Sequence, residues 1–320
     1  MSLWRRLADA LDNPIVGKEG VSRMRTWRAP VVATLYLSLI GAVGFAWLNL
    51  AEQPSQFSNG QPVAAIVGSQ AFAAMAFFQL ALVCLFAPAL AAGAISGERE
   101  RQTLDVLLVS RVSAFGIVWG KLLAAMAYVL LLILTALPLF AAVFLFGGID
   151  FSQFLLSQLV TVSTALCLGA VSVFFSALFQ RSLAATVTSY AAAFALTGGT
   201  AIVSLFVQVG QGVRRASPGG AGAQLVAEWY FNPFFALWDI LFGAPGASTT
   251  VRGFLQLLIF GVNSGPAGSG GPAVDPWQVC VGFEAVIAAV AVAGAVALVR
   301  GHRIFRPRRS LEPAAVAEAG

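Results

Sequence analysis

The chain has 320 residues, of which 58% are hydrophobic and only 10% are charged, and its formal net charge is +5. Soluble domains carry roughly 25% charged residues, so a chain with so few could not cover a water-facing surface. The composition therefore excludes a soluble globular protein and predicts an all-α membrane protein. The basic residues cluster at the ends of apolar runs, which is typical of membrane topology and not of nucleic-acid binding.

The N-terminal residues 1–29 include an amphipathic segment, NPIVGKEGVSRMRTWR, at 13–28. Asn13 can cap a helix and Pro14 suits its first turn. At 100° per residue, most apolar side chains share one face and most polar ones the other, as in helices that lie in a membrane interface. The charged residues of this candidate helix are Lys18, Glu19, Arg23 and Arg25. A simple topology anchor would have the same composition, so both interpretations stay open.

Six apolar runs are each long enough to cross a bilayer core about 30 Å thick, which needs around 20 residues per helix. They lie at about 30–50, 69–93, 117–147, 154–179, 183–209 and 279–299. We expect them to form one six-span transmembrane domain over residues 30–300, because the spans must pack on each other.

The basic residues also predict the orientation of the spans. Of the 19 Lys and Arg residues, only Arg214, Arg215 and Arg252 fall in segments on one side of the six runs. The positive-inside rule then places the other side in the cytoplasm. Both termini, including the basic tail at 301–320, are expected there.

The cytoplasmic segment at 94–116 joins the second and third runs and contains alternating charges followed by an apolar patch. The charges are Glu98, Arg99, Glu100 and Arg101, with Asp105 one helical turn later. The patch consists of Leu104, Leu107 and Leu108 at i, i+3, i+4 spacing. A short helix must bury such a patch, either on the bundle or on another protein. The neighbouring charges favour a specific protein contact over lipid.

The fifth run has small residues at every fourth position, which form a helix-packing stripe. They are Ala185, Ser189, Ala193, Thr197 and Ala201. Such a stripe lets helix backbones approach closely in lipid. The contact can lie within one subunit or between two subunits.

The segment at 210–278, between the fifth and sixth runs, is expected outside the cell. Its apolar pieces AEWYFNPFFALWDILFG and VRGFLQLLIFG, within 224–262, are too short to cross a bilayer. They predict an outer hairpin of re-entrant or interfacial helices, or a pair of short lid helices packed on protein.

The sequence offers no chemistry of its own. It has one histidine, His302, and three cysteines scattered in apolar runs, so no metal site is expected. No catalytic set is visible, and GIVWGK at 116–121 lacks the spacing of a phosphate-binding loop. Glu284 is the exceptional acid within a run, and its position near the outer end favours the membrane interface.

The stretch from the second to the third run, PALAAGAISGERERQTLDVLLVSRVSAFGIVWGKLL onward, resembles the type-2 ABC exporter permeases. The segment at 13–28 is similar to their N-terminal elbow helix, and NPFFALWDILFG also resembles them. Their loop pattern is roughly G-E-x-E-x-G-T-L-E-x-L-L. It is matched by Gly97, Glu98, Glu100, Thr103, Leu104, Leu107 and Leu108. Gln102 replaces the usual Gly and Asp105 the usual Glu, changes that we expect to matter little.

The resemblance implies a six-span permease in the cell membrane, working as a homodimer or heterodimer with a similar permease. It also implies two cytoplasmic ATPase subunits, which contact the segment Glu98–Leu108 and the elbow helix. ATP and Mg would then bind the partner subunits, and no cofactor is expected on this chain. Membrane lipid is expected to surround the spans. The alternatives are an ion-coupled carrier or channel without an ATPase, which would need charged pore rings or paired broken spans, and an intramembrane enzyme.

Overall fold

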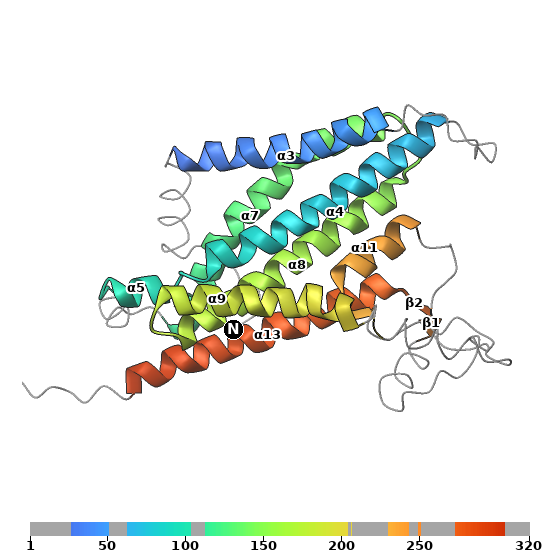
Figure 1. The fold of residues 1–320 in the computed structure, drawn as a ribbon. Coiled ribbons are helices and arrows are strands. Elements are labelled where there is room, and N and C mark those ends of the chain that lie inside the picture. Colours follow the sequence, from blue (N-terminus) through green and yellow to red (C-terminus); the bar gives the residue numbers. More distant parts are fainter. Residues whose placement is uncertain are drawn as a thin grey trace, which may run out of the picture.

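A computed structural model describes residues 27–50, 63–103, 113–203, 206, 230–242, 249–250 and 273–304 (Figure 1). Six of the helices in these ranges are long and apolar enough to cross a membrane. They are α3 (Arg28–Leu50), α4 (Val63–Ala91), α7 (Ala114–Phe144), α8 (Phe151–Leu178), α9 (Ser182–Phe194) with its continuation, and α13 (Pro276–Ile304). The prediction of an all-α membrane protein with six spans is confirmed.

Shorter elements complete the described fold. Helix α5 (Ser96–Glu100) follows α4, and α11 (Pro233–Phe242) precedes α13. A π-helix, η1 (Ala195–Gly199), continues α9. In the described residues, the strands β1 (Thr249–Thr250) and β2 (Ala273–Val274) form a single two-residue antiparallel pairing.

Local signals in the sequence fix where the spans begin and turn. Ser113 caps α7, because its hydroxyl accepts from the backbone N–H of Gly116 at 3.0 Å. Asp150 caps α8 in a capping box with Gln153. Between these helices, Gly147 and Gly148 have φ angles of +80° and +84°, a conformation that glycine adopts without steric cost. The two spans are therefore joined by a tight turn.

Helix α8 lies at the centre of the bundle. It packs against α4, α7, α9, α11 and α13, while α3 packs on α4 and α7 at the periphery. The buried face of α8 is rich in Ser, Thr, Ala and Gly, and the hydroxyls of Thr161 and Ser172 donate to their own i−4 carbonyls. Small side chains of this kind allow several helices to approach one helix closely.

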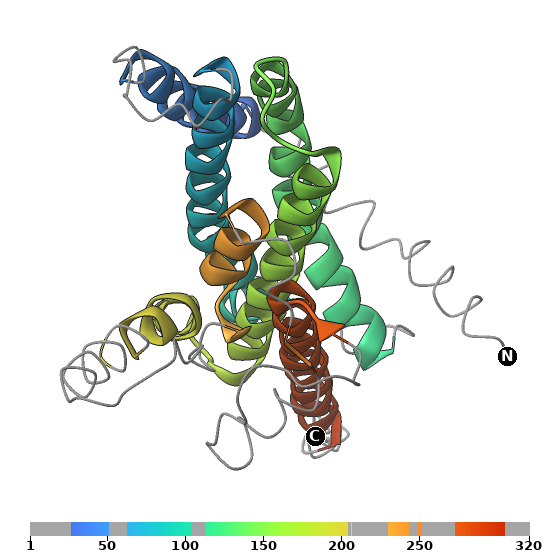
Figure 2. The same ribbon diagram turned by 90° about the vertical axis from the view of Figure 1, so that its right-hand side faces the viewer.

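The spans alternate in direction, so the connections gather at two ends of the bundle. One end, here the α5 end, contains α5, the beginnings of α7 and α9, and the last turns of α8 and α13 (Figure 1). The other, the α11 end, contains α11, η1 and the beginnings of α8 and α13. Viewed from the α11 end, α9 stands at the edge of the bundle (Figure 2).

The small-residue stripe of α9 packs within the chain. Ala185, Ser189, Ala193 and Thr197 are buried and Ala201 is half-buried. Helix α9 contacts α8 and α4, and the Tyr190 hydroxyl donates to the carbonyl of Leu85 in α4. The opposite face of α9 exposes Leu183, Val187 and Phe194. That exposed face, not the stripe, is available to lipid or another subunit.

Two predicted features lie largely outside the described residues. They are the elbow helix at 13–28 and most of the segment at 210–278. Helix α11 is the best described part of the latter, and its ten residues are too few to cross a bilayer. Ala236, Leu237 and Ile240 are buried against the bundle. This packing on protein is what the lid interpretation expects of α11.

Candidate functional site

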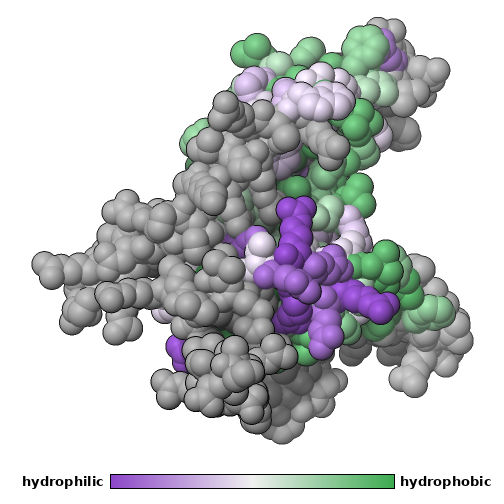
Figure 3. All heavy atoms as spheres, turned by 90° about the vertical axis from the view of Figure 1, so that its left-hand side faces the viewer, coloured by the Kyte–Doolittle hydropathy of each residue, from purple (hydrophilic) through white to green (hydrophobic). Residues whose placement is uncertain are grey.

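The site begins where α4 ends. Residues 92–95 turn the chain, and α5 then presents its charges at the α5 end of the bundle. Ile95 and Ser96 are buried, whereas Glu100, Arg101, Gln102 and Thr103 are exposed. In the space-filling view of this end, hydrophilic side chains gather in one patch (Figure 3).

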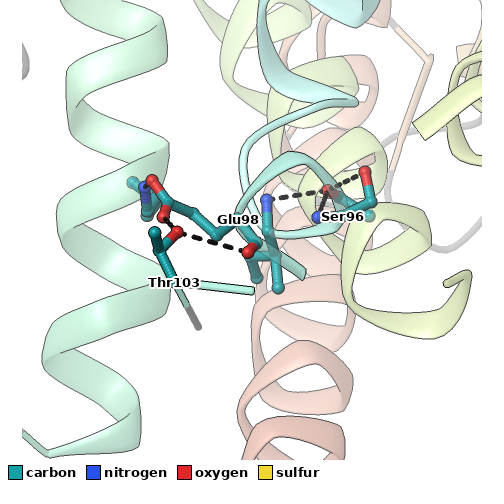
Figure 4. Close-up of polar contacts among 6 residues, drawn as sticks. Ser96, Glu98 and Thr103 are labelled. Atoms are coloured by element: carbon teal, nitrogen blue, oxygen red, sulfur yellow. Dashed lines mark hydrogen bonds and ion pairs between the residues drawn. The ribbon is translucent and has the colours of Figure 1, made fainter. Parts of the chain in front are cut away.

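Ser176 of α8 anchors the start of α5. Its Oγ accepts from the backbone N–H groups of Ile95 and Ser96, both at 2.9 Å. The Ser96 and Ser176 hydroxyls lie 3.2 Å apart, and Ser96 also donates to the carbonyl of Ala92 at 3.1 Å. Since a hydroxyl has one proton and two lone pairs, Ser176 then donates to Ser96 and all its capacity is used. This one side chain satisfies the first N–H groups of α5 (Figure 4).

Glu98 connects α5 to α7. Its Oε1 lies 3.0 Å from Nζ of Lys121, whose side chain is only 4% exposed. The Thr103 hydroxyl donates to the same carboxylate, and the Thr103 backbone N–H donates to the Glu98 carbonyl at 3.0 Å. Partial burial raises the pKa of Glu98, but the bonds from Thr103 and Lys121 outweigh it, so the pKa lies below its usual range. Glu98 and Ser96 point in opposite directions from α5 (Figure 4).

Arg99 connects α5 to the end of α8. Its two terminal nitrogens donate to the carbonyls of Phe179, at 3.0 Å, and Ala177, at 3.2 Å. The last carbonyls of a helix have no partner within the helix and carry its partial negative charge. A guanidinium donates hydrogen bonds to these carbonyls and its positive charge offsets their partial negative charge, so Arg99 caps the C-terminus of α8.

Glu100 connects α5 to the start of α9. Its carboxylate accepts from the backbone N–H of Ser182 at 2.7 Å and from the Ser182 hydroxyl at 2.9 Å. Ser182 is the first residue of α9, where the helix dipole favours an anion. These two donors hold the pKa of the Glu100 carboxyl below its usual range.

Three consecutive residues of α5 therefore contact three different spans. Glu98 binds α7, Arg99 binds α8 and Glu100 binds α9. This cluster, with Ser176 beneath it, is here called the α5 junction. A displacement of α5 would act on all three helix ends at once.

The turn after α5 gives a physical reason for the glycine in the family pattern. Gln102 has a φ of +59°, in the left-handed region. The left-handed conformation costs a residue with a Cβ about 1–2 kcal/mol, whereas glycine adopts it without this cost. Gln102 therefore strains the local backbone where a glycine would not.

Sequence reasoning found the charges of the α5 junction but not their partners. Glu98, Arg99 and Glu100 were expected to pair with another protein, yet the structure gives each a partner within the chain. Lys121, a single cation at the start of an apolar helix, was the signal available. Leu104, Asp105, Leu107, Leu108 and the elbow residues lie outside the described part of the chain.

Glu284, which the sequence analysis expects near the membrane interface, is buried inside the bundle. Its side chain lies two turns inside α13, is 5% exposed, and approaches Thr164 of α8. The reason is that α13 begins at Pro276, earlier than the apolar run indicated. Among the described residues, no group of His, Cys, Asp and Glu could hold a metal ion.

Comparison with known proteins gives a family for the chain. Residues 14–263 match the family described as ABC-2 family transporter protein. The match spans the α5 junction and five of the six membrane helices. No curated protein matches the chain.

Proposed function

The chain belongs to the ABC-2 family of transporter proteins, and we propose that it couples to a separate ATPase subunit through the α5 junction and residues 101–108. Membership makes it the membrane component of an ABC transporter. Such a permease needs a contact with its motor and a connection from that contact to the spans.

The connection is the observation that supports this proposal most strongly. Glu98, Arg99 and Glu100 bind the ends of α7, α8 and α9, so a force on α5 reaches three spans together. Each span is a continuous helix packed on its neighbours, and such elements move as rigid bodies. ATP binding on the partner would thus be transmitted to the bundle.

The motor contact is assigned to the residues that follow the junction. Arg101 and Thr103 are exposed, and Leu104, Leu107 and Leu108 follow in sequence. A few apolar anchors with charges around them are typical of residues that dominate a protein interface. The elbow helix, with Lys18 and Arg23, is proposed as a second contact.

The same proposal specifies how the permease is oriented in the membrane and how the subunits assemble. The α5 end is proposed to face the cytoplasm of the cell, with both termini on that side, in agreement with the distribution of Lys and Arg. ATP and Mg would bind the partner subunits. Two permeases, identical or similar, would form the translocation path, and the exposed face of α9 with Leu183, Val187 and Phe194 is one surface suited to that contact.

Co-purification with a candidate ATPase, such as one encoded by an adjacent reading frame, tests the contact. Leu107→Asp would place a charge in the apolar centre of the interface, so it should abolish capture of the ATPase. Leu145→Asp, at an exposed position in the turn after α7, is the matched control for a new charge elsewhere. Undiminished capture by the Leu107 variant would refute the docking segment, and absence of any ATPase partner would favour an ion-coupled carrier.

A further inference from the structure

Glu284 is a buried acid that the proposed coupling does not use. It is 5% exposed, and among the described residues its Oε2 has no hydrogen-bond partner. The Ser163 side chain also lies beside the carboxyl. The titratable groups around it are thiols, those of Cys84 in α4, Cys167 in α8 and Cys280 in α13. No cation in the described part of the chain forms an ion pair with this carboxyl.

The hydrogen bonds at Thr164 indicate which form of the acid is present. The Thr164 Oγ1 lies 2.9 Å from the Val160 carbonyl and 2.7 Å from Oε1 of Glu284. A hydroxyl has one proton, so it can donate to only one of these acceptors. If it donates to Val160, the shorter contact requires a proton on Glu284. If it donates to Glu284, an anion would be buried with few hydrogen bonds and, among the described residues, no cation beside it, which is costly.

A small cavity beside Glu284 is lined in part by the start of α11. Its volume is about 10 Å³, and its lining includes Thr197 of η1, Phe231, Pro233 of α11 and Glu284. Asn232 holds the start of α11 against this region, since its Nδ2 donates to the Thr197 carbonyl at 2.6 Å and to the Thr200 hydroxyl at 2.7 Å. An ionised carboxylate would need water or further donors, for which a cavity of this volume has little room.

We propose that Glu284 is a proton-binding site, at which the packed bundle holds the neutral acid and loss of the proton favours separation of the start of α11 from η1 and α13. Proton loss and separation of the start of α11 favour each other, because separation admits water and water stabilises the carboxylate. The site is at the α11 end, remote from the α5 junction, and does not depend on how the ATPase binds.

Infrared difference spectroscopy tests the protonation state of the full chain in lipid nanodiscs. We expect the wild-type spectrum at neutral pH to contain a protonated carboxyl band that disappears in Glu284→Gln. Asp239→Asn, which removes a half-buried carboxylate from α11, is the control for loss of an acid elsewhere. In Thr164→Val the band should persist at an altered frequency, because the acid loses its hydrogen-bond partner. A wild-type-minus-Glu284→Gln difference containing only carboxylate bands would overturn the proposal.

Labelling of the native thiols tests the opening. A thiol reagent applied over a range of pH reports access to Cys280 and Cys167, with each site resolved by mass spectrometry. The rate should rise with pH more steeply in the wild type than in Glu284→Gln, which gives the baseline due to thiol ionisation alone. Equal slopes in the two proteins would refute the link between proton loss and opening.

Discussion

Glu100 and Ser182 join α5 to the first residue of α9 through two hydrogen bonds to one carboxylate, at 2.7 and 2.9 Å. This contact closes the α5 junction on the side of α9, where the charge of Glu100 meets the positive end of the helix dipole. Because this contact is exposed, it should contribute little to global stability. Its expected role is to hold α5 and α9 in a fixed position relative to each other.

The first prediction concerns pH. The folded-state pKa values of Glu98 and Glu100 are both lowered, so their contribution to stability is present above the unfolded pKa and is lost as pH falls through the folded values. Thermal unfolding in nanodiscs should show wild-type Tm decreasing below about pH 4.5. The double variant Glu98→Gln/Glu100→Gln should show a shallower decrease. Parallel curves for the two proteins would contradict the assignment.

The second prediction concerns the pair between Glu98 and Lys121. Glu98→Gln removes a carboxylate from beside a buried ammonium, which should cost about 3 kcal/mol of unfolding free energy. Adding Lys121→Met removes the buried positive charge and should restore most of that loss. Denaturation of the single and double variants measures both steps. A double variant less stable than Glu98→Gln would show that the pair is not the source of the effect.

The third prediction concerns the backbone at Gln102. Gln102→Gly removes a left-handed penalty of about 1–2 kcal/mol but increases the entropy of the unfolded chain, so a net gain of about 0.5–1 kcal/mol is expected. Gln102→Ala keeps the Cβ and should gain nothing. The measurement is Tm of the three proteins. A glycine variant that is no more stable than the alanine variant would place this turn in another conformation.

The fourth prediction concerns the stripe of α9. Ala193 is 4% exposed in the contact with α8 and α4, so Ala193→Leu should overpack it and cost about 1–3 kcal/mol. Ala191→Leu, on the exposed side of the same helix, is the matched control and should be nearly neutral. Thermal unfolding of both variants at low protein concentration separates folding from subunit association. Equal Tm values would contradict packing of the stripe within the chain.

The sequence was sufficient to predict the six spans because apolar length is a strong signal in a membrane protein. Only part of the α5 junction could be predicted from the sequence. Its charges were visible, but Arg99 binds the carbonyls of Ala177 and Phe179, and Glu100 binds Ser182. These groups look like any others in the sequence. Only the fold brings them together, since about 80 residues separate them from α5.

The burial of Glu284 was not predicted for a related reason. A single acid near the end of an apolar run has no periodic signal that distinguishes an exposed position from a buried one. Its burial depends on where α13 begins and on the small face of α8 that receives it at Thr164. The positive φ of Gln102 was equally hidden, because the residue type itself gives no reason to expect it.

The central claim is that the α5 junction transmits motion from the ATPase to the spans, and Glu100→Gln tests it most directly. The variant weakens the link to Ser182 but leaves residues 104–108 unchanged, so ATPase capture should stay at the wild-type level. In proteoliposomes containing permease and ATPase, permease-stimulated ATP hydrolysis should fall, while Leu145→Gln, at an exposed position in the turn after α7, should retain it. Full stimulation by the Glu100 variant would contradict the account.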